Sequence, residues 1–345
     1  MGLAREPMKI LFIGKQGTSL TGAGTYDEIV LRELRKRHEV HLLASEDDLD
    51  ADWDIAHCSD LKHLPARVAN RLACPLVVDV HDYYWTRYYH FLCLDFPLRF
   101  ILQKYRKWHY SRLFKKISAV IVHGRFMYDA IPHPRKYLNF YFGLDYSGIG
   151  SAPWEDRENL ILFVGGDYFR KGLPRLLRAM PQVLASVPDA SLLVIGKDYW
   201  YARVFARHLA RGLPVKFVSG LPRDEVYRTY ARGRVLVLTS EIEALSLVSA
   251  EATMAGVPPI LADVGGMPEV VKDRETGFIV PLADTQLLAE RIVTCLTDRE
   301  ESERLVARGQ AFFSQFTIQG MMSRLDEIYR DVVANTDSSK HRNGV

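Results

Sequence analysis

"VLVLTSEIEALSLVSAEATMAGVPPIL", residues 235–261, contains the parts of one strand–helix–strand unit. The apolar run 235–240 predicts a strand, the segment from Ser246 to Met254 predicts a short helix, and "PPILA" (258–262) predicts the next strand. Apolar runs of this kind are typical of parallel strands that are covered on both faces. The stretch therefore indicates an α/β protein with a parallel sheet.

The same alternation fills both halves of the 345-residue chain. Further strands are predicted at 9–14, 39–44, 54–58, 75–82, 119–124, 160–166, 190–196, 215–220 and 277–281. Around 143–160 the sequence is rich in glycine, serine and charge, as in a linker. We predict two Rossmann-like domains, 1–147 and 148–314, then an amphipathic helix within 315–335 and a disordered polar tail, 336–345.

Composition excludes several classes of protein. The net charge is only +3, from 45 basic and 42 acidic residues, so the chain is no polycation, and we expect no nucleic-acid partner. No stretch is long and apolar enough to span a membrane, and the N-terminus reads as a first strand, not a signal peptide. The four cysteines are widely spaced, as reduced thiols in a cytoplasmic protein would be, and indicate no zinc site.

Two carboxylates flank the predicted start of the helix at Ser246. Glu243 lies in the loop before this helix, and Glu251 lies on it. The amides of a first helical turn favour an anion, and a carboxylate can accept two hydrogen bonds from a vicinal diol. These groups suit a sugar or a ribose joined to phosphate. From the spacing alone, solvated surface charges remain an alternative.

The larger pattern around these residues resembles a known family. Glu243-x7-Glu251 is followed by A-x-x-x-G-x-P and by "VGGMPEVV…GFIV", as in the retaining glycosyltransferases of family 4. That resemblance implies the GT-B fold, in which two Rossmann-like domains face each other across a cleft. It also implies that the C-terminal helix returns to the N-terminal domain. The implied donor is a nucleotide-diphospho-sugar, most often a UDP- or GDP-sugar, used without a bound metal or further cofactor.

The resemblance also implies roles for particular residues. Glu251 would bind the ribose hydroxyls of the donor, and Glu243 would contact the transferred sugar. The backbone amides of Leu245, Ser246 and Leu247 would meet the diphosphate. These roles place the whole donor beside one loop and one helix start.

A second donor-binding segment is "FVGGDYFRKG", residues 163–172. Gly165 and Gly166 end a predicted strand, and Lys171 occupies the position of the family's pyrophosphate-binding lysine. A cation there would stabilise the departing diphosphate. The family arginine five positions before that lysine is absent, since Gly166 stands there, and Arg170 is the candidate substitute. The alternative is that both cations are ordinary loop charges.

The loop after the first strand, 14–28, is rich in glycine. Backbone amides at Gly22, Ala23 and Gly24 could approach a phosphate, as the family's N-domain glycine loop does. The spacing is not a dinucleotide fingerprint, because Asp27 stands where the third glycine belongs, and no P-loop lysine closes it.

Two histidines end predicted strands of the first half. His81 lies where the family often has a histidine close to the donor sugar, and we take it as a catalytic candidate. A lone histidine is also commonly structural, and His57 is interpreted in that way.

Residues 97–116 carry seven basic side chains and no acid. An apolar stripe is expected on one helical face: Leu98, Ile101, Leu102, Tyr105, Trp108 and Leu113. Such a helix could lie on the anionic inner face of a membrane, and would make the protein peripheral. The alternative is a helix whose apolar stripe packs on the core.

The resemblance therefore implies a retaining, metal-independent hexosyltransferase with Glu243, Lys171 and His81 as catalytic residues. The acceptor hydroxyl would belong to a glycan, a lipid or a small metabolite. Two alternatives remain open: a GT-B nucleotide-sugar epimerase, and a non-catalytic protein that binds nucleotide sugars.

Overall fold

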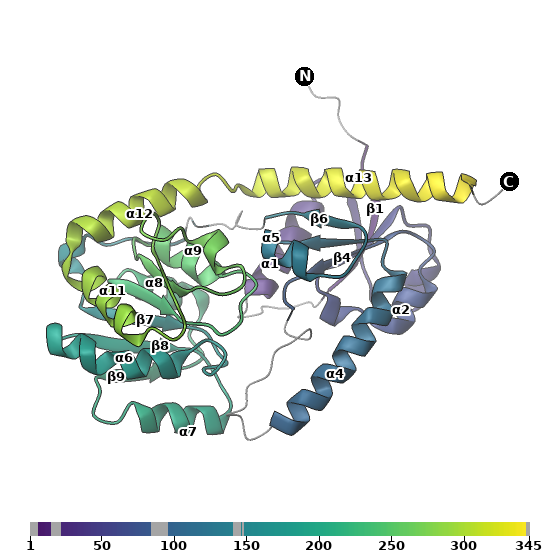
Figure 1. Cartoon of the computed structure of the whole chain (residues 1–345). Coiled ribbons are helices and arrows are strands. Elements are labelled where there is room, and N and C mark those ends of the chain that lie inside the picture. Colours follow the sequence, from purple (N-terminus) through teal and green to yellow (C-terminus); the bar gives the residue numbers. More distant parts are fainter. Residues whose placement is uncertain (1–5, 15–21, 84–95, 141–145, 147, 343–345) are drawn as a thin grey trace. The chain divides into compact units, whose positions relative to one another are not determined.

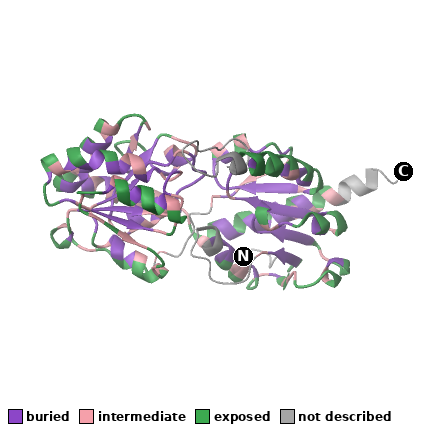
Figure 2. Ribbon diagram, turned by 90° about the horizontal axis from the view of Figure 1, so that it is seen from below, coloured by how far each residue is buried: buried purple, intermediate pink, exposed green. Residues whose placement is uncertain are grey.

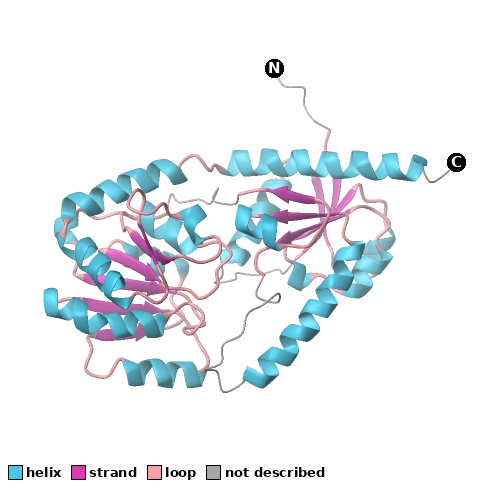
Figure 3. Cartoon of the chain, in the orientation of Figure 1, coloured by secondary structure: helices cyan, strands magenta, loops and turns pink. Residues whose placement is uncertain are grey.

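The computed structural model describes residues 6–14, 22–83, 96–140, 146 and 148–342. The chain forms two compact units (Figure 1). The N-terminal unit comprises Met1–Leu144 and Phe316–Val345, and the C-terminal unit comprises Asp145–Gln315. Each unit is built on one parallel sheet with helices against it (Figure 3). The α/β, Rossmann-like fold class predicted from the alternating pattern is confirmed.

The sheet of the N-terminal unit has the strand order β2-β1-β3-β4-β5-β6, and every described pair is parallel. Its strands are β1 (Lys9–Ile13), β2 (Glu39–Leu42), β3 (Ile55–Cys58), β4 (Leu76–Val80), β5 (Ala119–Val122) and β6 (Lys136–Leu138). Its helices are α1 (Gly22–Leu34), α2 (Ala66–Arg71), α4 (Phe96–Leu113), α5 (Arg125–Ala130) and α13 (Ile318–Arg342). The central strands are buried along their length, which explains their mostly apolar sequences, and His57 on β3 and Asp79 on β4 are buried polar exceptions.

The C-terminal helix α13 packs on the N-terminal unit (Figure 1). Its buried side chains recur at helical spacing: Met321, Met322, Leu325, Ile328, Tyr329 and Val332. The Asp326 carboxylate accepts hydrogen bonds from His38 Nε2 at 3.0 Å and from Arg37 Nη1 at 3.1 Å. Polar and apolar contacts thus fix this helix to a unit that is distant in sequence.

The C-terminal helix extends beyond its predicted end, and the predicted disorder of the tail 336–345 stays a prediction. Helix α13 does not end near residue 335 but continues to Arg342. Residues 336–342 contain neither proline nor glycine, so nothing in them breaks a helix that packing has already nucleated.

The sheet of the C-terminal unit has the order β12-β11-β10-β7-β8-β9, again with parallel pairs. Its strands are β7 (Leu160–Val164), β8 (Ser191–Ile195), β9 (Val215–Val218), β10 (Val235–Leu238), β11 (Pro259–Ala262) and β12 (Phe278–Val280). Its helices are α6 (Leu173–Ser186), α7 (Trp200–Leu209), α8 (Arg223–Tyr230), α9 (Leu247–Met254), α10 (Met267–Val270), α11 (Thr285–Thr297) and α12 (Arg299–Phe313). Figure 2 shows the buried strands between helices whose outer faces are exposed.

The order of this second sheet locates a ligand site. From β7 the next two strands along the chain, β8 and β9, lie successively closer to one edge of the sheet. Strand β10 then lies on the other side of β7, and β11 and β12 follow toward the opposite edge. The direction therefore reverses between β7 and β10, which are neighbours. In doubly wound sheets, ligands bind at the carboxyl ends of the two strands that flank such a reversal.

Candidate functional site

Lys171 and Glu243 meet at the reversal point of the second sheet. Lys171 follows β7 in the loop that leads to α6, and Glu243 follows β10 in the loop that leads to α9. The Lys171 Nζ and Glu243 Oε2 atoms form an ion pair across 72 residues of sequence. The fold thus brings together two residues that were predicted separately from two motifs.

Arg170 also faces Glu243. Its Nη1 atom lies 3.5 Å from Glu243 Oε2 and 3.4 Å from the Ile242 carbonyl oxygen, while its Nε donates to Asp167 at 3.1 Å. One carboxylate is therefore approached by two cations, and Ser240 Oγ lies 3.4 Å from the same oxygen. This arrangement places two cations, Lys171 and Arg170, with two carboxylates, Asp167 and Glu243, at the carboxyl edge of the sheet.

Burial shifts the pKa values of Glu243 and Lys171. Glu243 is only 5% exposed. Burial would raise the pKa of Glu243, but Lys171 and Arg170 outweigh that effect and hold the pKa below its usual value. Burial lowers the pKa of Lys171, and Glu243 only partly offsets this. The carboxylate is thus kept ionised beside a desolvated ammonium group.

Close packing requires the glycines of the donor-binding segment 163–172. A Cβ atom at Gly166 would lie 2.4 Å from the Lys197 carbonyl oxygen, so no larger residue fits. The family arginine therefore has no room at this position. A Cβ atom at Gly172 would lie 1.9 Å from the Thr239 carbonyl oxygen, and its φ of +79° suits glycine alone. Gly165, also at positive φ, lies against the Lys171 side chain.

The loop after β10 ends at a capped helix. Ser246 caps α9 by accepting a hydrogen bond from the Ser249 amide at 3.3 Å, and the helix starts at Leu247 as the sequence predicts. The side chains of Leu245, Ser246 and Leu247 are buried, which leaves backbone amides as the polar groups of this turn. Gly266 approaches the loop so closely that a Cβ atom would lie 1.9 Å from the Ala244 carbonyl oxygen.

Glu251 lies on α9 in a different environment. Its carboxylate accepts from Tyr230 at 3.2 Å, from Tyr227 at 3.4 Å and from Arg223 at 3.4 Å. Burial raises the pKa of Glu251, although Arg223 and the tyrosine hydroxyls act in the opposite direction. Sequence reasoning missed these three α8 residues. Their spacing of four and three residues would have placed them on one helical face, but not against Glu251.

A cavity of about 40 Å³ lies at the carboxyl ends of β8 and β9. Tyr168, Gly196, Arg203, Arg207, Phe217, Val218 and Ser219 line it. A much larger cavity of about 840 Å³ runs along the edge strand β9, with Leu213, Val215, Val218 and Leu221 in its lining. None of the predicted site residues lines either cavity, so neither cavity by itself marks the candidate site.

The N-terminal unit holds a buried network of histidines and acids. Asp79, wholly buried on β4, lies 2.7 Å from His57 Nε2 and 3.5 Å from His123 Nε2. The Tyr329 hydroxyl of α13 bonds to His57 Nδ1. The structural role interpreted for His57 is confirmed, because its ring joins a buried acid to the C-terminal helix.

His81 lies just beyond the end of β4, as predicted, beside this network. Its Nε2 donates to the Ser59 carbonyl oxygen at 2.7 Å, and its ring stacks on His123 with 4.8 Å between centroids. Burial, and then His123, lower the pKa of His81 to about 4. The ring is therefore neutral near pH 7, and its Nδ1 carries the lone pair.

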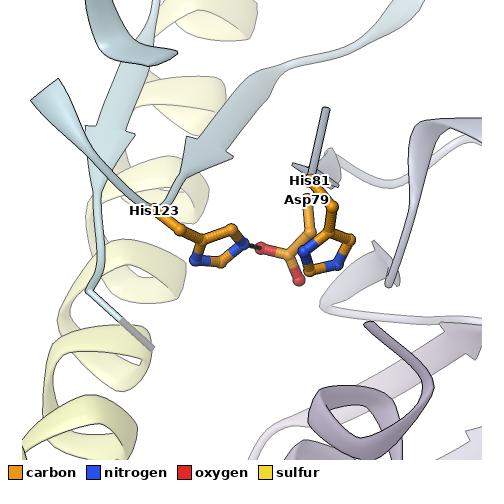
Figure 4. A group of neighbouring side chains, drawn as sticks. All are labelled: Asp79, His81 and His123. Carbon is orange, nitrogen blue, oxygen red and sulfur yellow. Dashed lines mark ion pairs between the residues drawn. The ribbon is translucent and has the colours of Figure 1, made fainter. Parts of the chain in front are cut away.

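Among the described residues, Asp79, His81 and His123 form a group whose possible metal-ligand atoms lie within 4.8 Å of one another (Figure 4). The two imidazole planes differ by only 10° and are stacked. The lone pairs of stacked rings lie in separate planes, so one ion cannot lie in both. Asp79 is also already paired with His57. We therefore assign no metal ion to this group.

The prediction of a glycine loop after β1 is wrong in one respect. Helix α1 begins at Gly22, so Gly22, Ala23 and Gly24 form its first turn rather than part of a loop. Residues 15–21 lie outside the described part of the chain. A first helical turn also presents free amides, so the local structure is consistent with the predicted phosphate-facing role, which stays a prediction.

Asp27, in the place of a third glycine, has an unusual environment. It is 6% exposed on α1. Burial, and then the Asp79 carboxylate, raise the pKa of Asp27 from 3.8 to about 7. Between these values the folded protein keeps a proton that the unfolded chain releases, so the contribution of Asp27 to stability falls as the pH rises through this window.

An Asp27→Asn variant should therefore gain stability over the unmodified protein as the pH increases. The gain should be near zero around pH 4 and level off above about pH 7, at no more than about 4 kcal/mol. Melting temperatures measured from pH 4 to pH 8 test this. The matched control is Glu28→Gln on the exposed side of the same helix. A gain that is constant with pH would contradict the assignment.

Comparisons with known proteins agree with the geometry of the C-terminal unit. Residues 149–312 match the model of the family described as glycosyl transferases group 1. The chain is 34% identical over 152 residues to the sulfoquinovosyl transferase SQD2 of Arabidopsis thaliana, covering 43% of this chain and 29% of that protein. It is 33% identical over 151 residues to a GDP-mannose-dependent phosphatidylinositol monomannoside mannosyltransferase of Corynebacterium glutamicum, covering 41% and 39% of the two chains. The aligned part thus spans less than half of either relative.

Solved structures share the whole fold. The Anabaena protein HepE in complex with UDP and glucose superposes with a TM-score of 0.74 at 19% identity, covering 94% of this chain and all of that one. Such a likeness establishes the GT-B type of two Rossmann-like units, as the resemblance implied. The matched family segment contains Lys171, Glu243 and Glu251, which the geometry had already singled out. Similarity to known glycosyltransferases therefore centres on the candidate site.

Proposed function

We propose that the protein transfers a sugar from a nucleotide-diphospho-sugar to an acceptor hydroxyl, with retention of the anomeric configuration. The observation that carries this is the pairing of Lys171 and Arg170 with Glu243 at the reversal point of the second sheet. The relatives' names include sugar transferases, and the Anabaena structures contain UDP or UDP-glucose. A UDP- or GDP-sugar is therefore the proposed donor.

In this proposal the two cations bind the donor diphosphate. As the bond between the anomeric carbon and the phosphate oxygen breaks, negative charge grows on the phosphate, and Lys171 and Arg170 stabilise it. The amides at the start of α9 add partial positive charge. Because protein cations meet this need, the proposed reaction requires no bound metal, and activity should persist in a chelator.

Glu243 is proposed to face the transferred sugar. Its low pKa keeps it an acceptor for sugar hydroxyls and a stabiliser of positive charge at the anomeric carbon. The acceptor oxygen bonds to that carbon on the face that the phosphate leaves, and its proton passes to the departing phosphate. His81, neutral in the other unit, is kept as a proposed contact of the sugar and not as a proton donor.

Glu251 is proposed to hold the ribose of the donor. A carboxylate presented by two tyrosines and Arg223 has a fixed orientation, as bidentate recognition of a diol requires. The expected result of Glu251→Gln is weaker binding of the nucleotide.

Thermal shift with UDP-glucose, GDP-mannose and ADP-glucose tests the proposal. A donor that binds only the folded state must raise the melting temperature, by the equivalent of about 2.7 kcal/mol at a concentration of 100 Kd. We expect one nucleotide to dominate and Glu251→Gln to weaken its effect. If none of the three sugars, nor free UDP or GDP, shifts the melting temperature, the proposal fails.

Release of nucleoside diphosphate separates the alternatives. A transferase should hydrolyse its donor slowly without an acceptor and faster with one. An epimerase would change the sugar without any dependence on an acceptor hydroxyl. A non-catalytic binding protein would show the thermal shift but no turnover with any acceptor pool.

A further inference from the structure

Helix α4 exposes the apolar stripe that the sequence predicts. Ile101 is 63% exposed, Tyr105 57% and Trp108 50%, and all three lie on one face at spacings of four and three residues. The opposite face carries Gln103, Tyr110 and Leu113, which are buried against the N-terminal unit. The alternative of a core-facing stripe is therefore wrong for its outer residues, although Leu113 does pack inward. Large apolar side chains exposed together mark an interaction surface.

The same helix carries positive charge that no acid offsets. Its described basic side chains, with those of the turn that follows, are all exposed: Lys104, Arg106, Lys107, Arg112, Lys115 and Lys116. Residues 97–116 contain no aspartate or glutamate. Within the described part of the chain, none of the six forms an ion pair. The charge is thus available to a partner.

Charge and aromatic rings are interleaved on this face. Lys104 Nζ lies 5.3 Å from the centroid of the Phe100 ring, and the Arg112 guanidinium carbon lies 4.1 Å from that of Trp108. Tyrosine and tryptophan beside lysine and arginine are the combination favoured where lipid headgroups meet acyl chains. A protein partner would need complementary acids and a matching groove, whereas an anionic bilayer offers a flat negative surface to any such helix.

We propose that α4 docks the N-terminal unit on an anionic lipid bilayer. Ile101, Tyr105 and Trp108 enter the headgroup region, and the basic side chains contact lipid phosphates. None of the described helices is long and apolar enough to pass through a membrane, so the proposed contact is with one surface. This inference does not depend on sugar transfer, since it rests on a helix outside the donor site.

Sedimentation of the full chain with lipid vesicles tests the proposal. At low salt the protein should pellet with vesicles of phosphatidylcholine and phosphatidylglycerol and stay in the supernatant with phosphatidylcholine alone. High salt should weaken the interaction, because screening shortens the range of the charges. Equal binding to both vesicle types, or to neither, would overturn the proposal.

Matched variants assign the binding to α4. Lys104→Gln with Lys107→Gln should weaken binding by about five-fold for each charge, or about 25-fold together. The control is Arg178→Gln with Arg308→Gln, which removes two exposed charges from α6 and α12 of the other unit and should change binding less than two-fold. If both pairs lose affinity equally, the binding reflects net charge and α4 is not the docking surface.

The apolar part has its own test. Trp108→Ser should weaken vesicle binding by about ten-fold, whereas Trp108→Phe should retain most of it. Trp108 is half-exposed, so melting temperatures of both variants should stay unchanged and show that each variant is folded. A dimer in solution that dissociates in the Trp108→Ser variant, without any vesicle binding by the unmodified protein, would assign this face to self-association instead and overturn the proposal.

Discussion

Replacing Lys171 by methionine is expected to reduce the rate of nucleotide release from the donor sugar by about 10²–10³-fold. The side chain is the cation closest to Glu243, and in the proposed reaction it stabilises charge that forms only as the glycosidic bond to phosphate breaks. The loss should therefore appear mainly in kcat. Steady-state release of UDP or GDP, with and without an acceptor alcohol, measures it.

A loss of activity must be separated from a loss of fold. Removing one partner of a buried ion pair leaves the other charge uncompensated, and that alone costs about 3–5 kcal/mol. The double variant Lys171→Met with Glu243→Gln removes both charges and should recover much of that stability. We expect it to melt near the unmodified protein and still to be inactive. A double variant that recovers activity would show that the pair supports structure only.

The neighbouring pair of Arg175 and Glu241 provides the matched control. Arg175 Nη2 lies 2.7 Å from Glu241 Oε1, and this pair links α6 to the loop after β10 that also carries Glu243. It is only partly buried and was not predicted to touch the donor. Arg175→Met should change kcat by less than about two-fold, since partly exposed ion pairs contribute little. An equal loss in both variants would point to loop geometry rather than to charge at Lys171.

The strands could be predicted from sequence because their signal is local. Apolar runs such as 160–164 and 235–238 are bounded by glycine and polar residues. A strand that is buried on both faces needs apolar side chains at successive positions, so such a run predicts a strand. The helix start at Ser246 was predictable for the same reason, since a capping serine acts on the next turn. The positions of Glu243 in the loop and of Glu251 on the helix were also predictable, because both residues belong to one short loop–helix segment.

The pairing of Lys171 with Glu243 could not be predicted in this way. It depends on β10 returning to lie beside β7, and an alternating pattern of strands and helices does not give the order of the strands. The hydrogen-bond partners of Glu251 could not be predicted for the same reason, because Tyr230 contacts Glu251 from another helix. Helical periodicity likewise predicts which side chains of α4 share one apolar face, but it does not predict whether the rest of the protein covers that face. Each of these properties is set by contacts between segments far apart in sequence.

The second large effect concerns the buried network of the N-terminal unit. Asp79→Ala should lower the free energy of unfolding of that unit by about 3–5 kcal/mol, because His57 and His123 then lose the buried carboxylate that they share. Burial would raise the pKa of Asp79, but these histidines hold it below 3.8. Its contribution to stability is therefore present above pH 3.8 and is lost as the pH falls further.

The network also explains how α13 is held. His57 bonds Asp79 through one ring nitrogen and Tyr329 through the other, so the acid fixes the orientation of the ring that the helix contacts. Tyr329→Phe should therefore destabilise the unit by about 1–3 kcal/mol, less than Asp79→Ala. The control is Asp331→Ala, whose half-exposed pair with Arg135 also ties α13 to this unit and should contribute less than about 1 kcal/mol.

Hydrogen exchange followed by mass spectrometry distinguishes the two units during these measurements. In Asp79→Ala, peptides from β4 and α13 should lose protection together, because the network joins them. Peptides from β7 and β10 should exchange as in the unmodified protein, since those strands belong to a separate compact unit. If α13 keeps its protection while β4 loses it, the apolar stripe that includes Leu325 and Val332 holds the helix without help from the buried charges.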